Sequence, residues 1–350
     1  MGVHCVPRQR VRSRVPAAAV LVLLSCSGLS LEATASELVP VRIGLTLEAS
    51  AAPLLIAVQA GFFQAEGLDA QLMFLKDDAS VSAAVVSGKA DIGMASLSAA
   101  FYAGAAAHGL KVIASRSSDQ TGFPMYALLV SKKAQAAGLT GVRGLPNSRI
   151  GVAGEDSGAY YALLSIASRF KLDPGSIKTI PLKSPARELA ALPQGDIDAA
   201  LLPFPTALRS VKGGQSLLRL SDFLQWQEGV VFTTAEDIAQ KRTLVERFMR
   251  AYQRGTAEYQ INFLNYDDGG DFIPGPHYQA YLDALARRLH IPADTLARTK
   301  TSCDRRANLD VADIGRQVLF WQGQGRLAKD VQASDLLDVS FIGEEILTPH

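Results

Sequence analysis

The sequence predicts a mixed α/β protein with two lobes, each a doubly wound, mainly parallel sheet. Three observations lead to this prediction: a strand–helix–strand unit near residue 50, a second copy of its pattern further along the chain, and a helix-rich segment after Val211. The chain has 350 residues, which is enough for two such lobes.

The first strand–helix–strand unit organises the N-terminal half. Residues 41–45 and 68–74 are predicted strands, and Pro53 suits the first position of the helix between them because a proline lacks the N–H that would stay unpaired there. Gly61 can end that helix in the left-handed conformation. The loop 46–50 therefore lies between a strand end and a helix start, where open α/β sheets bind ligands.

The same pattern returns 107 residues later. In each copy an Arg-Ile-Gly triplet opens a strand, a helix ends at glycine, and another strand begins three residues later at aspartate. The matched positions are Arg42-Ile43-Gly44 with Arg149-Ile150-Gly151, and Ala84, Gly88 and Asp91 with Ala191, Gly195 and Asp198.

The remaining elements follow from periodicity and from capping or turn residues. Further strands are expected at 90–94, 111–115, 126–131, 149–153, 177–182, 198–202 and 229–233, and helices at 80–87, 99–108, 159–170, 185–192, 242–263, 276–289, 293–298 and 311–322. Polar or rigid loops are expected at 116–124 and 203–205.

A chain that builds one lobe, crosses to a second and returns forms a two-lobed clamp with a ligand cleft. We expect the two crossover strands near 126–131 and 229–233. The expected lobes are residues 36–127 with 233–350, and residues 128–232.

The N-terminal end has the pattern of an export signal. An arginine-rich start precedes the apolar run 17–24, and small residues at Ala33 and Ala35 suit cleavage after Ala35. The apolar run is far shorter than the roughly 20 residues of a membrane span. A lipid anchor on Cys26, within Leu-Leu-Ser-Cys, is the alternative.

Export restricts the functions and the chemistry that the chain without residues 1–35 can have. Removal of residues 1–35 takes away four arginines and one glutamate, which changes the net charge from +1 to −2. Cys303 is then the single cysteine, so no internal disulfide can form. No basic block indicates nucleic-acid binding. We expect a monomeric periplasmic protein.

Two runs in the sequence resemble a known family. The first run lies in the first half and contains Pro53-Leu54, Gly61-Phe62-Phe63, Glu66-Gly67-Leu68-Asp69 and Ser87-Gly88-Lys89-Ala90-Asp91-Ile92-Gly93. The second run lies in the second half and contains Gly151, Ser157-Gly158, Leu172-Asp173-Pro174 and Gly195-Asp196-Ile197-Asp198-Ala199. The chain resembles periplasmic substrate-binding proteins of ABC importers, of the nitrate/sulfonate/taurine and thiamine-pyrimidine type, over residues 40–345. The resemblance implies a type II periplasmic-binding fold, delivery of a small molecule to membrane permease subunits, and no catalysis.

Acidic residues in the expected site depart from what oxoanion binding requires. Glu48 lies in the first loop, and Glu155 and Asp156 lie in the second. Carboxylates repel anions and accept hydrogen bonds from donors. Among sulfonates, pyrimidines and other heterocycles or aromatics, we therefore favour a neutral or donor-rich ligand.

The expected ligand-binding residues lie in the loops after the strands. Loop serines and threonines can instead cap the following helices, Phe204 can instead be a core residue, and Arg116 can instead be a solvated surface residue. Gly158 would let a ligand approach the backbone. The expected set is Thr46, Glu48, Ala49, Ser96, Leu97, Arg116, Asp156, Ser157, Gly158, Tyr160 and Phe204.

Two other functions remain open. Fungal pyrimidine synthases share this fold family, but they use a cysteine-rich motif and act in the cytosol. A binding protein that reports its ligand to a membrane receptor is the other alternative. None of the five histidines has metal-ligand spacing, and a Gly-x-Gly run at 323–328 follows a predicted helix instead of a strand. We therefore expect no metal, cofactor or catalytic residue.

Overall fold

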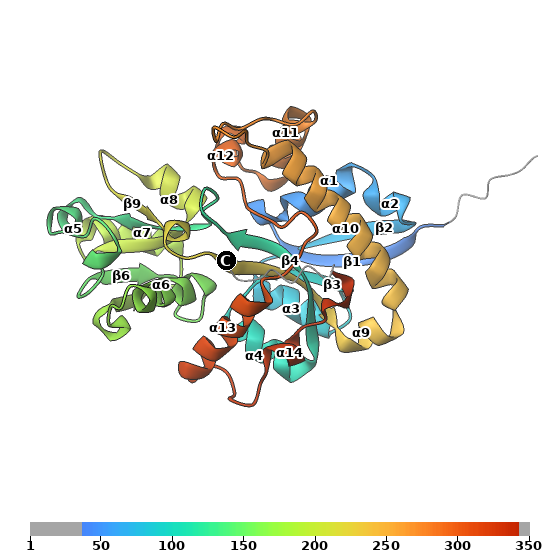
Figure 1. Cartoon of the computed structure of the whole chain (residues 1–350), viewed down its shortest axis with the longest axis horizontal. Helices are drawn as coiled ribbons and strands as arrows, with labels where there is room; N and C mark the ends of the chain where they lie inside the picture. Colours follow the sequence, from blue (N-terminus) through green and yellow to red (C-terminus); the bar gives the residue numbers. More distant parts are fainter. Residues whose placement is uncertain (1–36, 343–350) are drawn as a thin grey trace, which may run out of the picture. The chain divides into compact units, whose positions relative to one another are not determined.

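The computed structural model describes residues 37–342 and contains two five-stranded sheets (Figure 1). The first sheet has the order β2-β1-β3-β10-β4 and the second has the order β7-β6-β8-β5-β9. In each sheet three strands pair in parallel, and one strand, β10 or β5, runs antiparallel to both of its neighbours. The strands are β1 (Val39–Thr46), β2 (Leu68–Leu75), β3 (Ile92–Ser96), β4 (Leu110–Asp119), β5 (Tyr126–Val130), β6 (Arg149–Val152), β7 (Lys178–Pro181), β8 (Ala199–Pro203), β9 (Leu217–Arg219) and β10 (Trp226–Thr234).

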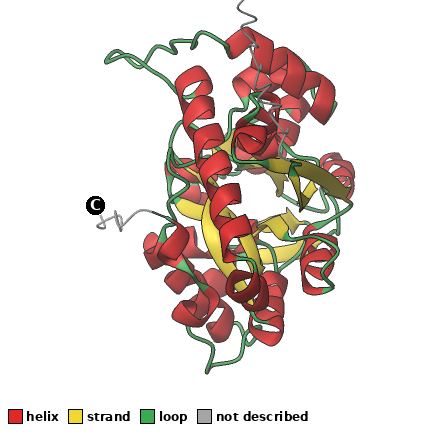
Figure 2. Ribbon diagram, turned by 90° about the vertical axis from the view of Figure 1, so that its right-hand side faces the viewer, coloured by secondary structure: helices red, strands yellow, loops and turns green. Residues whose placement is uncertain are grey.

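Helices cover the faces of both sheets (Figure 2). The helices are α1 (Ala52–Gln59), α2 (Phe62–Ala65), α3 (Asp78–Val86), α4 (Ala99–His108), α5 (Lys132–Ala136), α6 (Gly158–Arg169), α7 (Pro185–Gln194), α8 (Phe204–Ser210), α9 (Ala235–Gln240), α10 (Arg242–Phe263), α11 (Tyr278–Leu289), α12 (Ala293–Arg298), α13 (Val311–Gly323) and α14 (Ala333–Leu336). Within residues 37–342, none is both long and apolar enough to cross a bilayer. The predicted two-sheet α/β fold is confirmed, whereas the expected export signal and Cys26 lie outside the described residues.

The first strand–helix–strand unit has the predicted form. Strands β1 and β2 pair in parallel along their whole length, and Gly61 follows α1 with φ of 73°. Helix α1 is apolar nearly all round and packs against the long helix α10. A Cβ at Gly255 of α10 would lie 2.5 Å from the carbonyl oxygen of Pro53, so only glycine allows the two helices to approach this closely.

The 107-residue sequence repeat places the same arginine–aspartate interaction in both sheets. In the first sheet the Arg42 guanidinium binds the Asp91 carboxylate, and the backbone N–H of Arg42 donates to the same carboxylate at 2.9 Å. In the second sheet Arg149 binds Asp198 in the same way, with a backbone contact of 2.8 Å. Each pair, which we call an Arg–Asp clamp, joins the start of one parallel strand to the turn before its neighbour.

The packing around the first strand of each sheet also corresponds. Gly44 and Gly151 occupy the same place, and each is close-packed against three side chains from the following elements. These neighbours match at the same offset: Leu75, Val81 and Ala90 in the first half, and Leu182, Glu188 and Ile197 in the second.

Glu188 is the exception in this correspondence because it replaces the apolar Val81. Both side chains are fully buried. Neither carboxyl oxygen of Glu188 has a hydrogen-bond partner, and burial raises its pKa to about 8. The second half thus carries a protonated acid at a core position.

The expected capping residues start the helices of the second half. Ser157 accepts a hydrogen bond from the N–H of Tyr160 at the start of α6, and Ser184 does the same for α7, with Pro185 as the first helical residue. Helix α7 continues to Gln194, two residues further than predicted, and Gly195 ends it with φ of 79°.

Two loop predictions are wrong. The expected loop at 116–124 is strand as far as Asp119, because β4 pairs with β10 over this length. The expected rigid loop at 203–205 is the start of α8, since prolines are compatible with the first turn of a helix. The short elements α5, α9 and β9 were not predicted, although the side chains of Ser131 and Thr234 cap α5 and α9.

A buried polar network connects β10 to α13 and α6. The fully buried Asp313 accepts hydrogen bonds from the backbone N–H of Gln227 at 2.8 Å, from the hydroxyl of Tyr161 at 2.8 Å and from the amide of Gln317 at 2.9 Å. The side chain of Gln227 donates in turn to Ser115 at 2.8 Å. These bonds fix the last long helix against strands of the first sheet and a helix of the second.

The Arg–Asp clamps should contribute measurably to stability. We expect Asp91→Ala to lower the free energy of unfolding by about 2–3 kcal/mol, because it leaves a buried backbone N–H and a guanidinium unpaired. Asp198→Ala should cost about 1 kcal/mol, since its pair is more exposed. Urea unfolding at pH 7 measures both. Asp196→Ala, at an exposed neighbouring position, is the control, and a cost for Asp198→Ala no larger than this control would contradict the clamp.

Glu188 should make stability fall with rising pH. Its pKa is about 8 in the folded protein and close to the ordinary value of 4.5 in the unfolded chain, so unfolding releases a proton between these pH values. We expect Glu188→Val to stabilise the protein by roughly 3 kcal/mol more at pH 8 than at pH 5. Glu188→Gln should remove the same pH dependence. If the free energy of unfolding changed with pH in the same way for wild type and both variants, the raised pKa of Glu188 would be contradicted.

Candidate functional site

The carboxyl ends of the first sheet hold a compact group of charged side chains. We define the Arg116 cluster as Glu48, Asp78, Ser96, Arg116 and Glu228. These residues come from the loop after β1, the start of α3, the end of β3, and strands β4 and β10. The parallel pairing of β1 with β3 brings the first three together, as a switch-point site requires.

Arg116 is the centre of this cluster. Its Nη2 atom lies 3.1 Å from Glu228, 2.9 Å from the Ser96 hydroxyl and 3.9 Å from Glu48. The side chain is 2% exposed and lies in a strand, so the expected loop position and the alternative of a solvated surface arginine are both wrong. A Cβ at Gly229 would lie 2.4 Å from Nε of Arg116, so this glycine makes room for the guanidinium.

Three carboxylates surround this one guanidinium. Burial disfavours the charge of Arg116, yet Glu228, Glu48 and Asp78 together raise its pKa above the ordinary value. Burial raises the pKa of Glu48 and of Asp78, and Arg116 opposes both shifts. With all groups ionised, negative charge exceeds positive charge.

Glu48 and Glu228 differ in their access to solvent. Glu228 is 2% exposed and also accepts hydrogen bonds from the hydroxyls of Ser117 at 2.8 Å and Tyr126 at 3.4 Å. Glu48 keeps 51% of its side chain exposed while it lies beside Arg116. The first carboxylate therefore fixes and neutralises the guanidinium, and the second remains free to meet a ligand.

The hydroxyls of the first loop do not cap the following helix. Neither the short 3-10 turn Ala49–Ala51 nor α1 receives a side-chain cap. The Ser50 hydroxyl is buried without a hydrogen-bond partner, and the buried Thr46 hydroxyl lies close enough to Glu48 to lower its pKa. The capping alternative for this loop is therefore wrong.

Ser96, Leu97 and Ser98 have three different roles. Ser98 accepts the hydrogen bond that caps α4, while Ser96 accepts one from Arg116. Leu97 is a fully buried core residue whose N–H donates to the carbonyl oxygen of Glu228 at 2.7 Å. Of these three residues, Ser96 alone belongs to the Arg116 cluster.

The second-half loop contacts the first half directly. The N–H of Ala99 donates to the carbonyl oxygen of Asp156 at 2.9 Å, and Ser98 forms a β-bridge with Ser157. A Cβ at Gly158 would lie 2.7 Å from the Trp226 ring. The sequence predicts that a ligand approaches Gly158 closely. In the structure, Trp226 of the first sheet lies there instead.

Three residues of the second half that we expected in or near the site make other contacts. Glu155 accepts a hydrogen bond from Thr179 at 2.6 Å and lies 3.5 Å from Arg326. Tyr160 is stacked on Trp321 of α13. Phe204 is buried in the apolar core of the second sheet, which is the alternative that the sequence left open.

The sequence did not reveal Asp78 and Glu228 as partners of Arg116. Asp78 looks like a first-turn acid of a helix, and Glu228 precedes a predicted strand. The one available signal was Gly229 next to Glu228, which indicates a close approach inside a strand.

No metal or nucleophile site accompanies the cluster in the part of the chain that the structure describes. Residues 37–342 contain no group of three or more metal-ligating side chains. Cys303 is 2% exposed, and burial raises its pKa above the ordinary value, so its thiol stays protonated. The geometry supports binding through hydrogen bonds and charge.

Two sheets with helices on their faces and a charged group at the strand ends form a two-lobed α/β fold. The family model described as "NMT1/THI5 like" matches residues 48–262. The chain belongs to the NMT1/THI5-like family. No curated protein is similar enough in sequence to match this chain.

Solved structures with the same fold include periplasmic sulphonate- and nitrate-binding proteins. The alkanesulfonate-binding protein SsuA from Xanthomonas axonopodis pv. citri, bound to MOPS, has a TM-score of 0.60 at 18% identity, covering 87% of this chain and 100% of its own. The aliphatic sulphonate binding protein SsuA from Escherichia coli has a TM-score of 0.65 at 15% identity, covering 85% and 91%. The nitrate-binding protein NrtA from Synechocystis PCC 6803 has a TM-score of 0.58 at 13% identity, covering 87% of each chain.

Arg116 should be essential for stability because it compensates buried carboxylates. We expect Arg116→Met to cost about 3–5 kcal/mol at pH 7, and less at pH 5, where the uncompensated carboxyls can bind protons. The double variant Arg116→Met/Glu228→Leu should recover a large part of this loss. Arg219→Met, in an exposed pair with Asp222, should cost less than about 1 kcal/mol. Urea unfolding is the measurement, and additive costs in the double variant would refute the pairing.

Proposed function

We propose that the exported chain is the periplasmic solute-binding component of an ABC importer. It closes its two lobes on one small organic molecule and delivers this molecule to permease subunits in the membrane. The family match and the fold shared with sulfonate- and nitrate-binding proteins support this role. The proposal includes no catalytic step, and the buried Cys303 is unlike the reactive cysteines of an enzyme.

The observation that carries the ligand proposal is the charge of the Arg116 cluster. Glu228 lies 3.1 Å from Arg116 and both side chains are buried, so the pair offers an oxoanion no net positive charge. The half-exposed Glu48 adds an acceptor beside it. The site thus favours a ligand with hydrogen-bond donors, such as an aminopyrimidine or another neutral or protonated heterocycle, over nitrate and simple sulfonates.

The proposed mechanism is a ligand-induced shift toward the closed form. Ligand bound at the Arg116 cluster would also contact the second-half loop with Ser157, and such bridging contacts exist in the closed form alone. The direct contact between Ala99 and Asp156 already joins the two loops at 2.9 Å. A ligand adds its own contacts to this interface.

We propose lobe boundaries that follow the two sheets. Strand β5 pairs in the second sheet from Tyr126, and β10 pairs in the first sheet from Trp226. The chain therefore bends at about 120–125 and 220–225, a few residues before the expected crossovers. Residues up to 119 and from 226 then form one lobe, and the remainder forms the other.

Removal of the Glu48 carboxylate should weaken binding of a donor-rich ligand. We expect aminopyrimidines to raise the melting temperature of residues 36–350, and nitrate and taurine to have little effect. Glu48→Gln should reduce affinity about tenfold, as expected for a hydrogen bond to a charged acceptor. Binding by wild type should weaken as the pH falls and protonates Glu48.

The matched control for this experiment is Glu155→Gln. This carboxylate lies in the corresponding second-half loop but is directed to Thr179 and Arg326. Its replacement should leave affinity unchanged. Strong binding of taurine or nitrate, or equal effects of the two glutamate variants, would reject the ligand class. Absence of compaction in small-angle scattering with any saturating ligand would count against lobe closure itself.

A further inference from the structure

A cavity apart from the Arg116 cluster is bordered by β4 and β10, the two strands that carry Arg116 and Glu228. Its volume is about 1160 Å³, and it is bounded by β4, α6, the segment 221–227, the segment 302–310 and α13. Ser115 and Gln227 line it, whereas the next residues, Arg116 and Glu228, form the cluster. None of the five residues of the Arg116 cluster lines this space, which we call the rear cavity, so it is separate from the proposed site.

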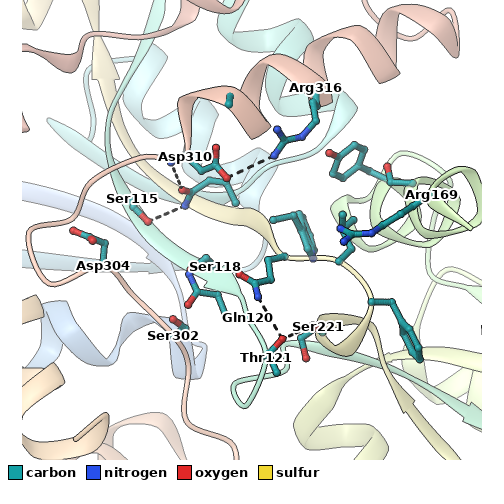
Figure 3. A pocket seen from close by; sticks show the side chains of 18 of the residues that line it. Ser115, Ser118, Gln120, Thr121, Arg169, Ser221, Ser302, Asp304, Asp310 and Arg316 are labelled. Carbon is teal, nitrogen blue, oxygen red and sulfur yellow. Dashed lines mark hydrogen bonds and ion pairs between the residues drawn. The ribbon is translucent and has the colours of Figure 1, made fainter. Parts of the chain in front are cut away.

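The rear cavity is lined mainly by uncharged hydrogen-bonding groups. Side chains from four separate segments converge on it, among them Ser115, Thr121, Ser221 and Ser302 (Figure 3). Helix α6 contributes Ser165 and Ser168, one turn apart on one helical face. Hydroxyls and amides both donate and accept, which suits a ligand that carries many hydroxyl groups.

Five charged side chains line the rear cavity, namely Arg169, Asp222, Asp304, Asp310 and Arg316, and some of them are paired. Arg316 lies 3.2 Å from Asp313 and 3.7 Å from Asp310. Asp222 is paired with Arg219 at 3.0 Å. Charges of both signs are present without a concentration of either, so the lining does not select an anionic or a cationic ligand.

Aromatic rings at the border of the cavity indicate a ligand with apolar faces as well as polar edges. Phe223 and Phe320 are half-buried and border the cavity beside the buried Trp226.

We propose that the rear cavity binds an uncharged saccharide. The hydroxyl groups of a sugar ring can satisfy hydroxyl and amide partners in both directions, and its apolar faces can stack on aromatic rings. The volume lies slightly above the usual range for small-molecule pockets, about 300–1,000 Å³, so the cavity has room for a disaccharide. Helix α6 belongs to the second lobe and the segment 302–310 to the first, so a saccharide in the cavity would contact both lobes. Binding of the saccharide and closure of the lobes would then affect each other's equilibrium.

The test is a titration of the full exported chain with maltose and glucose, followed by tryptophan fluorescence and melting temperature. Trp226 borders the cavity and serves as the reporter. We expect saturable changes with maltose, at least tenfold weaker in Ser168→Phe, which fills the cavity from an exposed position. Gln225→Ala, which removes a lining amide, should weaken binding as well.

The controls separate this site from the Arg116 cluster and from general effects. Ser334→Phe places the same side chain at an exposed helical position away from the cavity and should leave maltose binding unchanged, as should Glu48→Gln. The proposal is overturned if neither sugar gives a saturable change, if Ser168→Phe binds as wild type does, or if Glu48→Gln abolishes the signal. Tighter binding of glucuronate than of glucose would overturn the uncharged class.

Discussion

The Arg–Asp clamp is the interaction on which both halves of the protein depend. In each sheet an arginine at the start of one strand binds, through its side chain and its backbone N–H, an aspartate before the parallel neighbour. Parallel strands have no hairpin to fix their register, so a bidentate bond at their shared end supplies that constraint. Once the starts are aligned, the strands deliver Glu48 and Ser96 to the same edge, beside Arg116.

In the proposed site, Arg116 would influence ligand selectivity without contacting the ligand. Glu228 compensates the guanidinium inside the protein, and Ser96 takes a further hydrogen bond. What remains accessible is Glu48, an acceptor. Within a fold that also serves oxoanion-binding proteins, this arrangement would invert the preferred polarity of the ligand. In the proposed site, the pairing of Arg116 with Glu228 in β10 would account for that inversion.

Local signals predicted most of the fold, because capping residues, helix-ending glycines and period-two or period-3.6 patterns act over a few residues. Helices α4, α10 and α12 have the predicted bounds. The residues of the candidate site were harder to predict from the sequence. Arg116 was expected in a loop because its neighbours are polar, but those serines and glutamines pair across β4 and β10 or line a cavity. Glu228 and Asp78 lie 112 and 38 residues from Arg116 in sequence, and no local pattern encodes such distant partners.

The direct contact between the loops of Ser98 and Ser157 has a consequence for energy coupling in the proposed importer. Part of the free energy of the proposed closure would come from protein–protein contacts that exist without a solute. A closed but empty protein would resemble the loaded one at the permease and could stimulate ATP hydrolysis without transport. Weakening this contact should therefore reduce futile hydrolysis while it raises the solute concentration needed for uptake.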